Sequence, residues 1–248
     1  MPLSDSAPRY RWPILVTLIA LVLVGLYLLQ AKDEHHTALL ADFALIPKAW
    51  QEHWSEFCAK PSLLISSPAW FLREVMRPLC GASLLSAGPV HVGVAVAFLW
   101  IFGDNVEGRL GRLRFVVLWI CGAAVAGATH AWLHPHGEMP VVGHTGAIAA
   151  ILGTYALLFR KARVHVVRYL EVPCWTFIAA FFVLQIGPVQ QAFGWVEVLD
   201  GLDARAHLAS FVAGVALTPL LLVMNRCPEL LGQKQGKKKG KKKRKQSK

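Results

Sequence analysis

The sequence predicts an all-α membrane protein, a polytopic bundle of six transmembrane helices. Three observations support this fold class: 55% of the 248 residues are hydrophobic, only 17% are charged, and the apolar residues gather in runs long enough to cross a bilayer. The mean hydropathy of +0.45 is also well above the usual range for a soluble domain of this size. We therefore expect one lipid-embedded core with polar segments around it.

The first predicted span is the apolar run Pro13–Leu29. Its 17 residues are at the lower limit for crossing a hydrocarbon core about 30 Å thick, because a helix rises about 1.5 Å per residue. A cleaved signal peptide would need small residues at its cleavage site, and Leu29, Gln30 and Ala31 do not supply the pair. We interpret residues 1–30 as a cytoplasmic N-terminus followed by an uncleaved anchor.

Residues 31–88 mix tryptophans with charged residues and prolines, which is typical of a long outer loop with amphipathic pieces at the membrane interface. A core over residues 89–226 follows. It holds five more apolar segments of spanning or near-spanning length: Pro89–Phe102, Phe115–Leu133, Val141–Phe159, Val172–Gly187 and Ala206–Met224.

The charges of the connecting segments predict the orientation, because short loops rich in Lys and Arg stay in the cytoplasm. Basic residues occur between spans two and three (Arg109, Arg112, Arg114) and between spans four and five (Arg160, Lys161, Arg163, Arg168). The loops 134–140 and 188–203 carry no Lys or Arg. Both termini are therefore expected in the cytoplasm, with spans two, four and six running from outside to inside.

The net charge of +11 belongs to the C-terminal tail. Ten of the 26 Lys and Arg residues lie within Lys234–Lys248, which leaves 16 basic residues against 15 acidic ones elsewhere. We expect residues 227–248 to form a disordered basic cytoplasmic tail that contacts anionic lipid head groups. Nucleic-acid binding ranks second, because the tail lacks interleaved aromatic residues and the chain shows no folded RNA module.

Neither a metal nor a cofactor is predicted. Of the five cysteines, Cys121, Cys174 and Cys227 lie in or beside apolar runs, a disulfide between Cys58 and Cys80 is left open, and no CxxC pair indicates a zinc or redox motif. Four histidines cluster around the outer connection between spans three and four, and we interpret them as solvent-facing, with a surface metal site as the alternative: His130, His134, His136 and His144. His144 could instead change the charge of a pocket.

Three polar residues, His91, Thr145 and His207, lie near the outer ends of the inward-running spans, at one expected membrane depth. A hydroxyl facing an imidazole is the minimal pair of nucleophile and general base. The helix N-termini there would offer unpaired N–H groups, including that of Thr145, to an oxyanion. From the spacing alone, packing is favoured over catalysis, since Thr and His also serve as packing residues in membrane helices.

Small residues recur at four-residue spacing on the fourth and sixth spans. They are Thr145, Ala149 and Gly153 on one span, and Ala206, Ser210 and Gly214 on the other. Such spacing lets two membrane helices approach closely. A contact between the side chains at the outer ends of these two helices requires that approach.

Three segments resemble the rhomboid family of intramembrane serine proteases. FLWIFGDNVEGRLGRLRF (98–115), with Glu107 and Arg109, is similar to the family's signature between its second and third spans. GHTGAIAAILGTYALLFRKARV (143–164) resembles the nucleophile segment GxSGAIxGxLGAY, and AHLASFVAG (206–214) resembles the histidine segment AHxGGFxxG. The resemblance covers roughly residues 43 to 224 and implies the same six-span topology.

The resemblance implies an endopeptidase (a serine-type hydrolase) that cleaves transmembrane substrates near the outer membrane face. It places the nucleophile at Thr145, the base at His207, and supporting positions at His91, Gly143 and Gly146. The family's HxxxN pair falls on His91 and Ala95, so an amide donor is missing, and the β-methyl of Thr145 restricts the nucleophile. Ser210 replaces a small residue of the histidine segment.

Two functions are therefore carried forward: proteolysis by this altered dyad, and binding of transmembrane clients without cleavage, as in a pseudoprotease. A solute carrier or channel is disfavoured, because inverted repeats and buried midplane charges are not evident. A bacterial inner (plasma) membrane fits the short loops and the cytoplasmic N-terminus, and an organellar membrane is left open.

Overall fold

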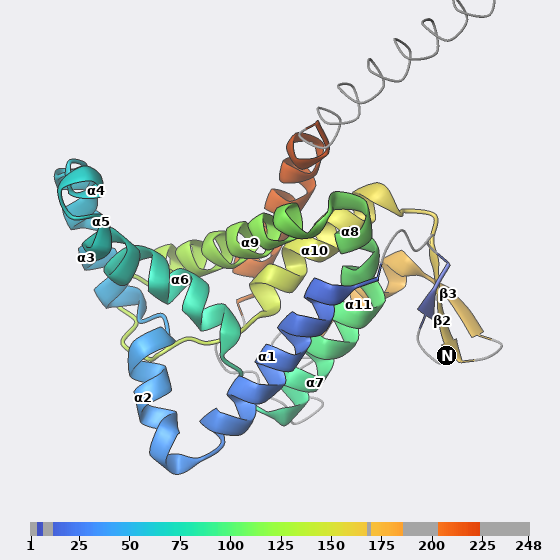
Figure 1. Ribbon diagram of the computed structural model, residues 1–248, viewed down its shortest axis with the longest axis horizontal. Helices are drawn as coiled ribbons and strands as arrows, with labels where there is room; N and C mark the ends of the chain where they lie inside the picture. Colours follow the sequence, from blue (N-terminus) through green and yellow to red (C-terminus); the bar gives the residue numbers. More distant parts are fainter. Residues whose placement is uncertain (1–3, 7–11, 168–169, 186–202, 224–248) are drawn as a thin grey trace, which may run out of the picture.

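The computed structural model of the chain describes residues 4–6, 12–167, 170–185 and 203–223, and most of them are helical (Figure 1). The predicted basic tail, Cys227 and almost all of the loop 188–203, which was expected on the outer side, lie outside the described residues. The helices are α1 (Ile14–Gln30), α2 (Asp33–Phe43), α3 (Pro47–Ala59), α4 (Leu63–Ser66), α5 (Pro68–Trp70), η1 (Phe71–Met76), α6 (Arg77–Gly81), η2 (Ala82–Leu84), α7 (Pro89–Phe98), η3 (Leu99–Gly103), α8 (Asp104–Leu110), α9 (Arg112–Leu133), α10 (Thr145–Leu158), α11 (Cys174–Val183) and a last helix, Ala204–Val223.

Three of these helical stretches are long and apolar enough to cross a membrane: Pro89–Leu110, Arg112–Leu133 and Ala204–Val223. The first is continuous through α7, η3 and α8. Shorter apolar helices lie at three more of the predicted spans, namely α1, α10 and α11. The all-α membrane bundle is thus confirmed, whereas the number of six crossings stays a prediction.

The boundaries of several spans differ from those expected. The second span does not end at Phe102 but continues to Leu110, where Gly111 takes a φ of +85° that glycine adopts without steric cost and so ends the helix. The fourth helix begins at Thr145 and not at Val141, because Val141 pairs with Leu45 in an isolated β-bridge. Apolar composition alone does not distinguish such an extended segment from a helix.

A small antiparallel sheet, which the sequence did not predict, pairs two strands in the connection between α10 and α11 with a short strand near the beginning of the chain. Its strands lie in the order β1 (Ser4–Asp5), β2 (Arg163–Val167) and β3 (Leu170–Pro173). Ser4 is in register with His165, and Arg163 with Pro173. The fifth apolar helix consequently begins at Cys174, after β3, and not at Val172.

The expected outer loop, residues 31–88, is folded into the short helices α2 to α6 with η1 and η2. They lie to one side of the bundle in Figure 1, and α3 and α6 pack against α9. A separate hydrophobic cluster joins the two parts, formed by Leu45, Trp50, Val75, Leu79, Ala82 and Ala131. Cys58 and Cys80 both carry free thiols, so the disulfide left open by the sequence is not formed.

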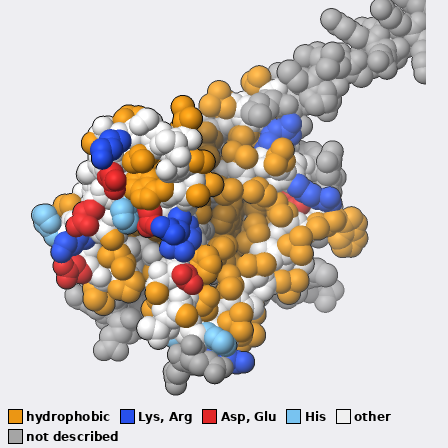
Figure 2. Space-filling model, turned by 60° about the vertical axis from the view of Figure 1, so that its left-hand side comes forward, with side chains coloured by type: hydrophobic (Ala, Val, Ile, Leu, Met, Phe, Trp, Pro, Cys, Tyr) orange, Lys and Arg blue, Asp and Glu red, His pale blue; other side chains and the backbone are white. Residues whose placement is uncertain are grey.

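Helix α10 is the most enclosed element of the main core. Every residue from Gly146 to Tyr155 is buried, and α10 packs against α9, α7, α8 and α11. The surface of the bundle is largely apolar: hydrophobic side chains cover much of the face in Figure 2, most of the acidic side chains lie on its left side, and Lys and Arg side chains lie on both sides. This arrangement suits a helical bundle surrounded by lipid, because lipid tails solvate exposed apolar side chains.

Glu107 holds the beginning of α1 against α8. Its side chain is nearly inaccessible, and its two carboxylate oxygens accept the backbone N–H groups of Leu15 (3.1 Å) and Val16 (2.9 Å). These N–H groups lie in the first turn of α1, where no carbonyl of the same helix can bind them. A carboxylate there also interacts favourably with the helix dipole.

Glu107→Gln is therefore expected to lower the free energy of unfolding by about 1–3 kcal/mol, because the amide nitrogen would face a backbone donor. Denaturant titration in detergent measures the change. Glu138→Gln is the matched control, since Glu138 is largely exposed and its ion-pair partner among the described residues is Lys48, at 2.6 Å. Equal stability of the two variants would contradict the assigned role of Glu107.

Candidate functional site

The beginnings of α10 and of the last helix bring Thr145 and His207 together. Thr145 is the first residue of α10, and its Oγ1 lies 2.9 Å from His207 Nε2, within hydrogen-bond distance. His207 is 6% exposed. A hydroxyl in contact with a largely buried imidazole is the arrangement required of a nucleophile and its general base.

Gln185, just beyond α11, fixes the tautomer of His207. The Oε1 atom of Gln185 can only accept, so the Nδ1 of His207 donates a hydrogen bond to it. Nε2 is then free to accept the proton of the Thr145 hydroxyl. Gln185 is itself buried, and its Nε2 donates to the carbonyl oxygen of Phe181 at 2.8 Å, which holds its oxygen in this orientation.

His91, on the first turn of α7, presents an unused N–H group. Its Nδ1 accepts the backbone N–H of Ala87 at 3.2 Å, so its proton is on Nε2. Within the part of the chain that the structure describes, this buried Nε2 has no hydrogen-bond partner. A buried donor without a partner is uncommon and suggests a ligand or transition state that would use it.

Gly143 leaves open the space between this donor and the hydroxyl. A Cβ atom on Gly143 would lie 3.6 Å from Thr145 Oγ1, 3.7 Å from His91 Nε2 and only 3.1 Å from His91 Cε1. Its φ of +148° also disfavours any larger residue. The space that a side chain at this position would fill is therefore close to both Thr145 Oγ1 and His91 Nε2.

The two glycines beside Thr145 have different surroundings. The N–H of Gly143 is already used, since it donates to the carbonyl oxygen of Ala82 at 2.8 Å. Gly146 allows α9 to approach, because a Cβ there would lie 2.2 Å from that of Ala126. The N–H groups of Thr145 and Gly146 lie in the first turn of α10, where no helical carbonyl precedes them.

Two further positions of the sequence analysis lie next to His91. His144 was expected to face water, and this was wrong: it is fully buried and stacks on His91 with a ring-centroid distance of 4.2 Å. Its Nε2 lies 3.3 Å from the carbonyl oxygen of His91. Ala95, one helical turn after His91, is also buried and supplies no polar atom.

The small residues predicted to bring two helices together do so in the structure. A Cβ on Gly153 would lie 2.1 Å from the carbonyl oxygen of Phe211, and one on Gly214 would lie 2.1 Å from that of Ala150. The Ser210 hydroxyl lies 2.9 Å and 2.7 Å from the carbonyl oxygens of Gly122 and Gly146. Ser210 therefore connects the last helix to both α9 and α10.

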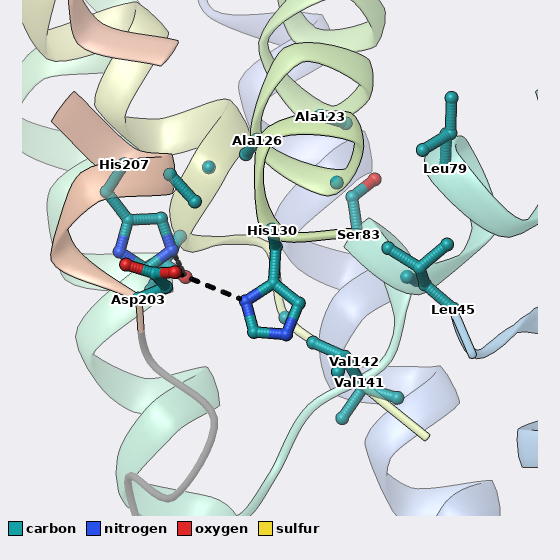
Figure 3. A pocket seen from close by; sticks show the side chains of 16 residues that line it. Leu45, Leu79, Ser83, Ala123, Ala126, His130, Val141, Val142, Asp203 and His207 are labelled. Carbon is teal, nitrogen blue, oxygen red and sulfur yellow. Dashed lines mark hydrogen bonds and ion pairs between the residues drawn. The ribbon is translucent and has the colours of Figure 1, made fainter. Parts of the chain in front are cut away.

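A cavity of about 50 Å³ adjoins the Thr145–His207 pair, which is room for a few water molecules. His130 of α9 and Asp203, directly before the last helix, also line it, and their side chains point toward each other in Figure 3. Sequence reasoning did not include Asp203, because 69 residues separate it from His134, its hydrogen-bond partner. Burial opposes ionisation of Asp203, but hydrogen bonds from Arg205 and His134 outweigh it, so the pKa of Asp203 is below its usual value.

Comparison with known proteins agrees with this architecture. The model of the rhomboid domain family matches residues 72–224, more than half of the chain. Rhomboid protein 1, mitochondrial, from Saccharomyces cerevisiae (strain ATCC 204508 / S288c) is 26% identical over 130 residues. That alignment covers 50% of this chain and 36% of the yeast protein, so only about a third of the relative's length is matched. With a helical membrane bundle that brings the two motif residues Thr145 and His207 into contact, this chain belongs to the rhomboid family.

Proposed function

We propose that this protein is an intramembrane endopeptidase in which Thr145 is the nucleophile and His207 the general base. The observation that carries the proposal is the 2.9 Å contact between Thr145 Oγ1 and His207 Nε2 beside a cavity that can hold water. Its substrates are transmembrane proteins, cut near the outer membrane face. We also propose that both termini lie in the cytoplasm and that the basic tail contacts anionic lipid head groups.

The reaction would proceed by acyl transfer. His207 Nε2 takes the proton of Thr145 as Oγ1 attacks the peptide carbonyl carbon, and then gives that proton to the leaving amine. A water molecule from the cavity, deprotonated by the same nitrogen, hydrolyses the resulting ester. Gln185 acts as a positioning residue, since its oxygen holds the Nδ1 proton of His207 and keeps Nε2 as the acceptor.

Three donors are available for the carbonyl oxygen as it becomes negatively charged. They are the Nε2–H of His91 and the backbone N–H groups of Thr145 and Gly146 at the positive end of α10. Gly143 contributes by keeping the space between His91 and Thr145 open. Gly143 does not itself donate a hydrogen bond to the oxyanion, because its N–H already donates to the carbonyl oxygen of Ala82.

The test is cleavage of a generic transmembrane reporter in liposomes by the wild type, Thr145→Ser and His207→Ala. Wild-type cleavage should fall to background in His207→Ala, since no other base contacts the hydroxyl within the described residues. Thr145→Ser should cut faster, because removal of the β-methyl frees χ1. A tenfold gain would correspond to about 1.4 kcal/mol of activation free energy.

The second candidate function is binding of transmembrane clients without cleavage. Ala95 favours it, because the buried position one turn after His91 lacks the amide of the family's HxxxN pattern. Crosslinking to the reporter that persists in His207→Ala, together with no cleavage by the wild type or Thr145→Ser, would support this function. Those results would exclude the proposed protease.

A further inference from the structure

Two histidines and one aspartate converge at the end of the bundle that holds the Thr145–His207 pair. His130 and His134 are one helical turn apart at the end of α9, and their ring centroids lie 4.6 Å apart. Asp203 Oδ2 lies 3.7 Å from His130 Nδ1 and 3.2 Å from His134 Nε2. The three side chains each offer one ligand atom, and these atoms all lie within 4.8 Å of one another.

The spacing of these atoms suits a tetrahedral metal ion. Zinc binds imidazole nitrogen and carboxylate oxygen at about 2.0–2.2 Å, which places neighbouring ligand atoms of a tetrahedron about 3.3–3.5 Å apart. The two separations from Asp203 Oδ2, 3.2 and 3.7 Å, bracket that value, and the ligand nitrogens of the two histidines lie within 4.8 Å of each other. Two imidazoles and one carboxylate form a ligand set that favours Zn²⁺ over Mg²⁺ or Ca²⁺, which prefer oxygen atoms.

The site is accessible to solvent and leaves room for a fourth ligand. The side chain of His134 is 44% exposed, whereas that of Asp203 is only 7% exposed. All three residues line an open pocket on the surface, and His130 and Asp203 also line the cavity next to Thr145 and His207. A water molecule could therefore complete the tetrahedron from either side.

The positive charge of Arg205 opposes the binding of a cation at this site. Its Nε and backbone N–H donate to Asp203 Oδ1 at 3.1 and 3.0 Å, and its Nη2 lies 3.3 Å from Oδ2. Its stronger contacts thus fall on Oδ1 and orient the carboxylate so that Oδ2 faces the two histidines. The Arg205 side chain is 64% exposed, so solvent screens its charge.

We propose that His130, His134 and Asp203 bind one Zn²⁺ ion at the entrance to the cavity of the Thr145–His207 pair. The ion would tie the end of α9 to the helix that carries His207, because the N–H of His207 donates to the carbonyl oxygen of Asp203 at 3.1 Å. Binding would therefore restrain the His207 helix. The inference does not depend on whether the pair cleaves peptides.

Zinc titration calorimetry on the full chain in detergent, without a polyhistidine tag, tests the site. The wild type should bind one Zn²⁺ per chain, and His134→Ala and Asp203→Asn should each weaken binding by at least tenfold. His136→Ala is the matched control, because His136 is an exposed histidine of the same loop and is not among the three ligands; it should bind as the wild type does.

Thermal unfolding supplies a second readout. Zn²⁺ should raise the melting temperature of the wild type and of His136→Ala but not that of His134→Ala, and Mg²⁺ should raise none of them. Without metal, His134→Ala should melt somewhat below His136→Ala, because His134 also loses its hydrogen bond to Asp203. The readout is therefore the change in melting temperature that each protein shows when Zn²⁺ is added. Equal zinc affinity in all four proteins, or no zinc binding by the wild type, would overturn the proposal.

Discussion

Gly214→Ala is expected to destabilise the folded protein by more than about 3 kcal/mol, although it adds only one methyl group. The new Cβ would lie 2.1 Å from the carbonyl oxygen of Ala150 and 2.7 Å from its carbonyl carbon. These are backbone atoms of α10, so no side-chain rotation can relieve the overlap. The two helices would have to separate, which would also break the contact of the Ser210 hydroxyl with the Gly146 carbonyl oxygen.

Unfolding in detergent and size-exclusion chromatography measure this loss, and Gly93→Ala is the matched control. No atom lies within 4 Å of a Cβ placed on Gly93, an exposed residue of α7. Alanine is a better helix former than glycine, so this variant should be unchanged or stabilised by up to about 1 kcal/mol. If both variants unfold like the wild type, the close approach of α10 and the last helix is wrong.

The parts of the fold that could be predicted are those that hydropathy and motif spacing determine. Hydropathy predicted the bundle, and small residues at four-residue spacing predicted the contact that Gly153 and Gly214 make possible. Hydropathy did not predict that Val141 is extended, because an apolar residue in a β-bridge has the same composition as one in a helix. The strands β2 and β3 were missed for a related reason, since basic residues in a short connection indicated only a loop.

The candidate site was predictable only where a motif marks it. Thr145 and His207 lie in segments similar to the family's, and the structure places them in contact, while their catalytic roles stay proposals. Gln185 follows an apolar helix without any pattern that would mark it, yet it is the partner of His207 Nδ1. Asp203 meets His130 and His134 only through the tertiary packing of the last helix beside α9, which no local pattern encodes.

His91→Leu is expected to reduce cleavage by about 10²–10³-fold, which is the usual effect of removing one oxyanion donor. The reason is that His91 Nε2 is a buried donor with no hydrogen-bond partner among the described residues. It borders the same open space beside Gly143 as Thr145 Oγ1 does. The donor would act only as negative charge develops on the carbonyl oxygen. The loss should therefore appear in kcat, with KM nearly unchanged.

His144→Leu separates this role from packing. The two histidine rings stack on each other at 4.2 Å, so both variants lose the stacked pair, but only His91→Leu removes the free Nε2–H group. His144→Leu should keep cleavage within several-fold of its parent. Both variants are best compared in the wild-type and Thr145→Ser chains, so that a slow nucleophile does not hide the difference. If the two leucine variants lose activity equally, and in proportion to the decrease in their melting temperatures, His91 acts through packing alone. The backbone N–H groups at the beginning of α10 would then be the remaining donors for the oxyanion.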